Sequence, residues 1–465
     1  MARAQNSKRG LADDYSQDHP LHKQIKSIIL TTSRLNPLTH QWLAEQRLYA
    51  TIQFPFHASK PHPITSLVCS ILRRPELAAY VRTLSCQGGD PPWAEWQGKV
   101  PKIPVAESDL QEPLSFVGKT GLPFRNTWME ELRKGTLDAF LAVLLSQLPR
   151  LQRLHLGPVF FLDIGLTGLV LRSILCNSHV DRLTPDISNK LSQLQSVSLE
   201  RPEGHYKDIS IRSNTESVLP FFYLPSLKEM SVLIDDPLDA IFQWPTAQPP
   251  SALGLVSLRL TGIRESHLGQ LLSAVPRLRS LHWEWCFDPD FEDRFNTPVI
   301  DLSLLMPALA HVRDTLTELA IPADCLYANR VAEPFPLRVQ GSAKALAGFD
   351  QLKKLFIPLV FFTGFSVSVR EELASCLPRN LEELTLTDDL FRDTDLQEQW
   401  YETRHNSAIS TWLVQVEIST PRLRKLCLVL QPEDHEISFD AIDVRNEIRE
   451  LTIHAGIELE ITHVY

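Results

Sequence analysis

The chain has 465 residues, of which 43% are hydrophobic and 22% are charged, so it is long enough to bury a large core. Its 46 lysines and arginines are outnumbered by 56 aspartates and glutamates, and the formal net charge of -10 argues against nucleic acid as a partner because phosphate binding requires concentrated cations. No apolar stretch reaches the roughly 18 residues of a membrane span, so we expect no membrane partner.

The seven cysteines are scattered, without a Cys-x-x-Cys pair, and no Asn-x-Ser/Thr acceptor for N-glycosylation occurs. Residues 1–20 are polar and charged and lack the apolar run of a signal peptide, which predicts a disordered tail. These features favour a cytoplasmic or nuclear protein whose thiols are reduced.

Residues 21–60 are predicted to form a small helical segment. Apolar residues recur at helical spacing from Leu21 to Ile29, residues 33–38 then break the helix, and a second helix runs through Trp42 and Leu48. Such a segment would cap one end of a repeat array, which needs a covered terminus.

A segment rich in proline and tryptophan follows at residues 87–130. Its prolines are incompatible with regular helix or central strand, so we interpret it as an inserted loop. Trp93, Trp96, Phe116 and Trp128 suggest that parts of this loop pack against the rest of the protein.

Residues 61–465 repeat the pattern L-x-x-L-x-L, in which the last two apolar residues face the same side of a strand. Several copies follow a Pro-x-Leu sequence, which would end a helix and start a strand. The copies are Val81/Leu84/Cys86, Leu151/Leu154/Leu156, Leu194/Val197/Leu199, Leu227/Met230/Val232, Leu255/Leu258/Leu260, Leu278/Leu281/Trp283, Leu316/Leu319/Ile321, Leu352/Leu355/Ile357, Leu381/Leu384/Leu386, Leu423/Leu426/Leu428 and Ile448/Leu451/Ile453.

Helical patterns alternate with these strands at 136–148, 266–275, 301–312, 369–376 and 408–416. The alternation predicts an α/β fold, a leucine-rich-repeat-like solenoid with a curved parallel sheet on its concave side, helices outside and the small N-terminal helical cap. The spacing between copies varies, so the array is irregular.

Residues that flank the middle apolar position of each strand would project from the concave face. They form a mixed, hydrogen-bonding surface that suits a protein or peptide partner. The predicted partner-binding residues are Arg153, His155, Arg259, His282, Glu284, Lys354, Phe356, Glu383 and Lys425.

The sequence gives no candidate catalytic, cofactor-binding or metal-binding set. His282 and Glu284 share a predicted face, but a metal site needs a third and usually a fourth ligand. Residues 118–120 read Gly-Lys-Thr, but Pro113 stands where a phosphate-binding loop needs its first glycine. We therefore expect a protein without enzymatic activity or cofactor, monomeric outside a complex.

Several stretches resemble the F-box/leucine-rich-repeat proteins that are abundant in filamentous fungi. Ser33-Arg34-Leu35 followed by Leu48-Tyr49-Ala50-Thr51-Ile52 is similar to the second half of the F-box, and the resemblance continues at 71–84, 349–355, 377–390 and 456–461. It implies a substrate-recognition subunit of an SCF-type ubiquitin ligase that binds the Skp adaptor. The adaptor-binding residues so implied are Leu21, Ile25, Ile28, Ile29, Leu35, Leu38, Leu48 and Tyr49.

The chain departs from that family at the start of the box. An F-box opens with Leu-Pro-x-Glu, which does not precede Leu21, so either the box is degenerate or the sequence starts inside it. The alternative interpretation is a non-catalytic leucine-rich-repeat scaffold with no link to a ubiquitin ligase, in which residues 21–54 serve only as a cap.

Overall fold

The computed structural model describes residues 37–55, 62–87, 102–161, 164–176, 190–199, 214–237, 243–287, 295–325, 337–365, 372–388, 390, 404–430 and 439–463. The predicted tail at 1–20 and the first predicted helix lie outside these residues. The chain divides into two compact units, Met1–Ser196 and Val197–Tyr465.

The first unit contains a parallel ladder of strands β1 (Thr51–Pro55), β2 (Thr83–Gln87) and β3 (Arg153–Leu156). Strands β2 and β3 lie where the leucine pattern predicts them. Strand β1 corrects the prediction that 21–60 is wholly helical, because helix α3 (Pro37–Ala50) ends where this strand begins. Ile52 and Phe54, two residues apart, are both buried, which is the alternation of a strand.

Helices occupy much of the segment predicted as a loop. Helices α5 (Gln111–Lys119) and α6 (Arg125–Lys134) follow the 3-10 turn Glu107–Asp109, so the loop prediction is wrong for this part of 87–130. Pro113 is the third residue of α5, where a helix has no internal partner for an N–H, and Pro123 precedes α6.

Trp128 confirms the prediction that aromatic residues of this segment pack against the body. Its side chain is completely buried, its indole Nε1 donates a hydrogen bond of 2.9 Å to the carbonyl of Ala139, and its ring contacts Phe116 and Phe124. Trp93 and Trp96 lie outside the described residues.

Asp138 links two helices of the first unit. It belongs to α7 (Leu137–Leu145), and its buried carboxylate accepts hydrogen bonds from the backbone N–H groups of Leu166 (2.7 Å) and Thr167 (3.2 Å). These N–H groups open helix α9 (Gly165–Leu175), whose own N-cap residue, Ile164, supplies no side-chain bond. Asp138 therefore caps a neighbouring helix.

The second unit contains eight strands that pair in parallel in the order β5-β6-β7-β10-β13-β14-β15-β16. They are β5 (Glu229–Leu233), β6 (Ser257–Thr261), β7 (Ser280–Trp283), β10 (Glu318–Ala320), β13 (Lys354–Pro358), β14 (Glu383–Thr387), β15 (Lys425–Leu430) and β16 (Glu458–His463). Strand β4 (Ser196–Leu199) lies at the division between the units.

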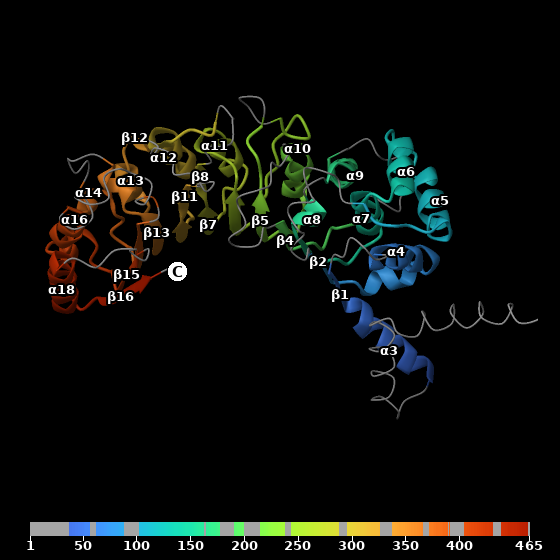
Figure 1. Ribbon diagram of the computed structural model, residues 1–465, viewed down its shortest axis with the longest axis horizontal. Helices are drawn as coiled ribbons and strands as arrows, with labels where there is room; N and C mark the ends of the chain where they lie inside the picture. Colours follow the sequence, from blue (N-terminus) through green and yellow to red (C-terminus); the bar gives the residue numbers. More distant parts are fainter. Residues whose placement is uncertain are drawn as a thin grey trace, which may run out of the picture. The chain divides into compact units, whose positions relative to one another are not determined.

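The helices of the second unit lie on one side of this sheet, as Figure 1 shows for α11, α12, α14, α16 and α18. The segments are α10 (Thr215–Val218), α11 (Glu265–Leu272), α12 (Leu302–Ala310), α13 (Val360–Thr363), α14 (Leu373–Cys376), α16 (Arg404–Leu413), α17 (Val416–Ser419) and α18 (Phe439–His454), with 3-10 turns at Leu219–Tyr223 and Lys344–Gly348. The predicted α/β class is confirmed as a mixed fold in which helices flank a parallel sheet.

One predicted strand is wrong. Ile448, Leu451 and Ile453 lie in helix α18, and the last strand, β16, follows Gly456. The spacing i, i+3 also suits a helix, and here Ile448 and Thr452 are buried on one face while Ile453 is 77% exposed. Gly456 has a φ of 69°, the left-handed conformation that commonly ends a helix.

Two short sheets accompany the main one. Strand β8 (Trp285–Phe287) pairs with β11 (Ala323–Cys325), and β9 (Val299–Asp301) pairs with β12 (Arg338–Gln340). The leucine pattern does not predict these four strands. Among the described helices, none is both long and apolar enough to cross a lipid bilayer.

Candidate functional site

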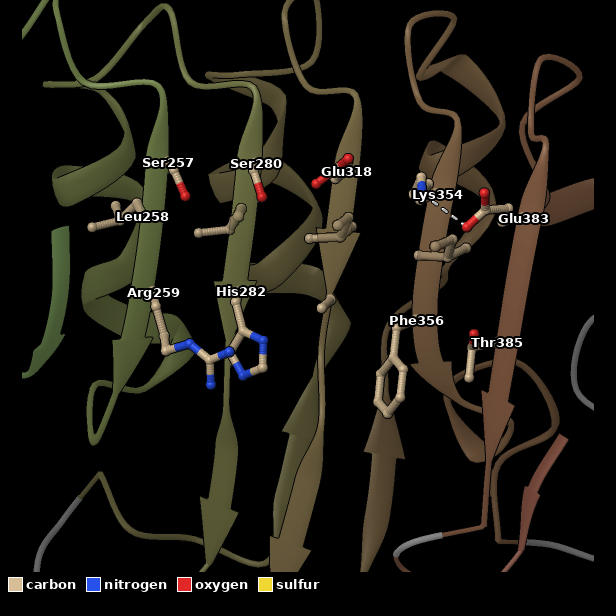
Figure 2. Close-up of a pocket in the computed structure, with 14 residues that line it drawn as sticks. Ser257, Leu258, Arg259, Ser280, His282, Glu318, Lys354, Phe356, Glu383 and Thr385 are labelled. Carbon is tan, nitrogen blue, oxygen red and sulfur yellow. Dashed lines mark ion pairs between the residues drawn. The ribbon is translucent and has the colours of Figure 1, made fainter. Parts of the chain in front are cut away.

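A groove of about 370 Å³ lies on the sheet of the second unit, over strands β6, β7, β10, β13 and β14 (Figure 2). The register of the strands arranges its lining in rows. Four lining leucines, Leu258, Leu281, Leu319 and Leu355, form the middle row, which Leu384 of β14 continues, and each of the five is at most 2% exposed. Because side chains alternate along a strand, the rows on either side of the leucines project from the opposite face of the sheet.

The first row is hydrophilic and consists of Ser257, Ser280, Glu318, Lys354 and Glu383, aligned strand by strand. Lys354 Nζ lies 3.0 Å from a carboxylate oxygen of Glu383. The hydrogen bond and the charge of Glu383 raise the pKa of Lys354, and the charge of Glu318 adds to this effect. The positive charge of this row is therefore locally compensated.

The second row consists of Arg259, His282, Ala320, Phe356 and Thr385. Arg259 is exposed and forms no ion pair with any residue that the structure describes, whereas His282 and Phe356 are partly buried. Ala320 is the smallest member of the row and lies between His282 and Phe356, so the groove is hollowed at this point.

His282 is held neutral near pH 7. Burial and, to a smaller extent, the positive charge of Arg259 together lower its pKa to about 4. In Figure 2 the side chains of these two residues lie next to one another. A neutral imidazole has one N–H donor and one acceptor, so His282 can hydrogen-bond to a ligand without carrying charge.

The structure brings five of the predicted partner-binding residues together in this groove: Arg259, His282, Lys354, Phe356 and Glu383. Lys425 lies on β15 next to Glu383 of β14, and its Nζ pairs with Glu460 at 2.6 Å and Glu458 at 3.8 Å. Arg153 and His155 lie on β3 of the first unit, where Arg153 is exposed and His155 is half-buried.

The prediction that Glu284 shares an exposed face with His282 is wrong. Glu284 is only 8% exposed and is absent from the groove lining. It lies between β7 and β8, which pair in different sheets, so the alternation of β7 stops at Trp283. Trp283 and Trp285 are both completely buried, as predicted.

The predicted adaptor-binding residues are described only in part. Leu21, Ile25, Ile28, Ile29 and Leu35 lie outside the described residues, and Leu38 lies at the second position of α3.

Leu48 and Tyr49 lie at the end of α3 and are half-buried. Burial raises the pKa of the Tyr49 hydroxyl, while the charge of Arg74 opposes this shift. Arg74 also forms two bonds of 3.0 Å to the carboxylate of Glu45, which fix α3 to the residue after α4 (Pro63–Arg73). Helix α3 is thus attached to the body of the first unit.

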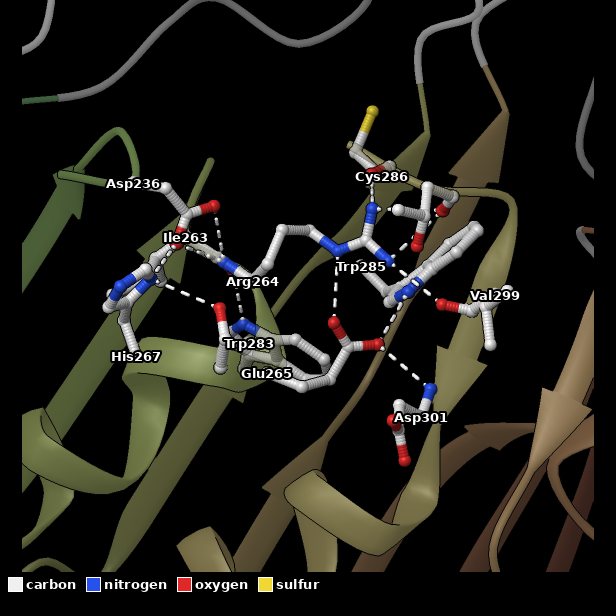
Figure 3. A network of polar contacts seen from close by, with 12 residues as sticks. Asp236, Ile263, Arg264, Glu265, His267, Trp283, Trp285, Cys286, Val299 and Asp301 are labelled. Atoms are coloured by element: carbon white, nitrogen blue, oxygen red, sulfur yellow. Dashed lines mark hydrogen bonds and ion pairs between the residues drawn. The ribbon is translucent and has the colours of Figure 1, made fainter. Parts of the chain in front are cut away.

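Sequence reasoning missed a buried polar network around Arg264, immediately before α11 (Figure 3). The guanidinium forms an ion pair of 3.0 Å with Glu265 and donates to the carbonyls of Cys286, Thr297 and Val299 at 3.0–3.3 Å. It also lies 4.8 Å from the ring centre of Trp285. We name Arg264, Glu265 and the groups they bind the arginine clamp.

Glu265 completes the clamp. One of its carboxylate oxygens accepts hydrogen bonds from Trp285 Nε1 at 2.9 Å and from the backbone N–H of Asp301 at 3.2 Å. Arg264 and Glu265 are each 5% exposed. The clamp therefore ties the start of α11 to strands β8 and β9, which lie outside the main sheet. An Arg-Glu pair before a helix gives no signal in the sequence that it will be buried.

A second buried contact adjoins the clamp. Asp236 accepts hydrogen bonds from the backbone N–H of Arg264, at 3.1 and 3.3 Å, and pairs with His267 Nδ1 at 2.5 Å. His267 is completely buried, and its ring contacts that of Phe295. Asp236 lies between β5 and β6, and its carboxylate fixes the residues at the start of α11.

The groove lining supplies groups that could bind a ligand. Among the described residues His282 makes no hydrogen bond to Ser257 or Ser280, so no serine–histidine pair is formed, and no cluster of three or more His, Cys, Asp or Glu side chains could hold a metal ion. The groups that line it can donate hydrogen bonds, attract charge and cover an apolar side chain.

No protein-family model matches this chain, and no curated protein matches it at a significant level. The resemblance to F-box/leucine-rich-repeat proteins therefore stays a prediction.

Proposed function

We propose that this protein is a non-catalytic interaction module, a leucine-rich-repeat-like solenoid whose concave face is the groove and whose ligand is a segment of another protein. The observation that supports this most is the alignment of the two rows. Five successive strands each give one leucine to the core and two side chains to the open face, so the open face is a continuous surface for a ligand.

We further propose that the partner bound in the groove is a client that the protein presents to an SCF-type ubiquitin ligase. This part rests on the resemblance of 33–35 and 48–52 to the F-box. Helix α3 would provide part of the adaptor contact, since it carries Leu38, Leu48 and Tyr49 and is fixed to the body of the first unit by the Arg74–Glu45 ion pair.

The alternative is a scaffold that binds clients in the same groove without an adaptor. It is favoured by the half-burial of Leu48 and Tyr49, because these side chains already pack within the first unit and so expose less surface to a partner. The two functions make the same prediction for the groove and different predictions for α3.

Co-purification with a Skp adaptor and its cullin separates them. Removing all residues before α4 would delete β1, a strand of the first unit, so a substitution is preferable. Leu38→Asp places a carboxylate in the first turn of α3, where negative charge favours the helix, so the fold should survive.

The matched control is Thr39→Asp, which adds the same charge in the same turn at a position outside the predicted contact. The receptor function predicts that the full chain and Thr39→Asp retain the adaptor and that Leu38→Asp loses it. If the folded full chain retains no adaptor, the ligase role is wrong and the scaffold function takes its place.

A further inference from the structure

We propose that the groove binds an extended peptide that crosses the strands, with an acidic side chain at Arg259 and His282 and a large apolar side chain over Ala320 against Phe356. This inference rests on the proposed function, because it specifies which protein segment the groove accepts.

The charges of the sheet face indicate where an acidic residue would bind. Lys354 is paired with Glu383, and Lys425 with Glu460 and Glu458. Arg259 has no such partner among the described residues, and the side chains next to it in the groove, Ser257 and His282, are uncharged near pH 7. A ligand carboxylate would supply the missing counter-ion and could form a bidentate pair with the guanidinium.

The apolar contact lies on the same row. Among the described residues that line the groove, Phe356 has the one large apolar ring, and its neighbour on β10 is Ala320, whose side chain leaves the space above it open. In Figure 2 the side chains of Phe356, Arg259 and His282 all extend toward the same end of their strands. Burying an apolar ligand side chain here would cover both residues and exclude water from the ring.

The register sets the distance between the two contacts. Arg259, His282, Ala320 and Phe356 lie on four successive strands, so Ala320 is two inter-strand steps from Arg259 and Phe356 is three steps from it. At about 4.8 Å per step, the distance from Arg259 to the apolar contact is about 10–14 Å. An extended chain advances about 3.3–3.6 Å per residue, so the acidic and apolar residues of the ligand should have about two or three residues between them.

The test uses the full chain and synthetic ten-residue peptides in a glycine–serine background, each with one glutamate and one tryptophan, in both orders and with one to six residues between them. Binding is measured by fluorescence anisotropy of a dye on the peptide. The proposal predicts tightest binding at about two or three intervening residues, and a loss of about tenfold or more for Arg259→Glu and for Phe356→Ala.

Matched controls isolate the two contacts. Arg313→Glu makes the same change at an exposed position on the turn after α12 and should leave affinity unchanged. Replacing the peptide glutamate by glutamine should weaken binding to the natural chain, because the ion pair with Arg259 is lost. The same replacement should not weaken binding to Arg259→Glu, because that variant has no guanidinium to pair with the peptide carboxylate.

A second readout is the titration of His282. A carboxylate bound next to the imidazole favours its protonated form, so the His282 ring should titrate at higher pH in the complex than in the free protein. This change is measured in the natural chain, so it cannot result from an effect of the Arg259 substitution on folding.

Three outcomes would overturn the proposal. Preference for a basic peptide that still depends on Phe356 and Arg259 would refute it while leaving the groove as the partner site. Binding of phosphoserine peptides but not of glutamate peptides would assign the site to a phosphorylated ligand. Failure of every peptide, together with co-purifying partners that tolerate Arg259→Glu and Phe356→Ala, would refute both this inference and the proposed function.

Discussion

Replacing Arg264 by methionine should strongly destabilise the second unit. Methionine keeps most of the apolar stem of arginine but removes the ion pair with Glu265 and the bonds to the carbonyls of Cys286, Thr297 and Val299. Glu265 would then remain buried, with the N–H groups of Trp285 and Asp301 as its remaining donors. Removing one partner of a buried ion pair costs about 3–5 kcal/mol, because the other charge is left uncompensated.

We expect Arg264→Met to lower the free energy of unfolding by about 4 kcal/mol, a large part of the about 5–15 kcal/mol that is typical of a domain. The measurement is urea denaturation followed by far-ultraviolet circular dichroism, with separate transitions fitted if the two units unfold independently. Arg277→Met is the control. Arg277 is exposed and lies five residues after the end of α11, so this variant should change stability by less than about 0.5 kcal/mol.

The double variant Arg264→Met/Glu265→Gln sharpens the test. Glutamine can still accept hydrogen bonds from Trp285 and Asp301 through its amide oxygen but carries no charge, so the double variant should be more stable than Arg264→Met alone. A loss within about 1 kcal/mol of that of Arg277→Met, or a double variant less stable than the single one, would refute the reasoning that an uncompensated charge dominates.

Four further predictions concern three sites. The pKa of His282, about 4, should rise in Arg259→Ala without reaching 6.5, because burial is the larger cause and remains; NMR titration of the imidazole checks this. Since the unfolded state binds more protons than the folded state between pH 6.5 and 4, His282 should make the protein less stable as the pH falls through this range, and His282→Asn should reduce that pH dependence of urea midpoints. Asp138→Ala removes the cap of α9 and should cost about 1–3 kcal/mol in urea denaturation, with Asp138→Asn losing less. Gly262→Ala should cost more than about 1 kcal/mol in thermal unfolding, because φ is 87° and the added Cβ would lie 2.7 Å from the carbonyl oxygen of Ile234; an unchanged melting temperature would contradict this.

The strands of the main sheet were predictable because each one contributes apolar residues to the protein core at fixed positions along the strand. Leucines such as Leu258 and Leu384 are nearly inaccessible, and at four of the copies a Pro-x-Leu sequence precedes the strand. The pattern fails at Ile448, where the same spacing also suits one face of a helix. It also misses β1, whose buried pair Ile52 and Phe54 has no leucine at the first position.

The groove was predictable in its residues but not in its shape. Alternation along each strand places Arg259, His282 and Phe356 on one face, yet only the register of neighbouring strands shows that they share a row with Ala320. The arginine clamp could not be predicted, because it depends on strands β8 and β9 lying next to the start of α11. Their backbone carbonyl groups accept the hydrogen bonds of Arg264. Contacts between backbone and side chain leave little trace in the pattern of residue types.

The sequential order of strands in the second unit has a consequence for how the unit opens. In the ladder that the structure describes, β16 has β15 as its neighbour, whereas β13 is hydrogen-bonded on both sides, to β10 and β14. Detaching β16 breaks one ladder, and detaching β13 breaks two. Amide protons should therefore exchange with solvent fastest at the C-terminal strand and progressively more slowly toward β13, so the protein's kinetic protection is graded along its own sequence.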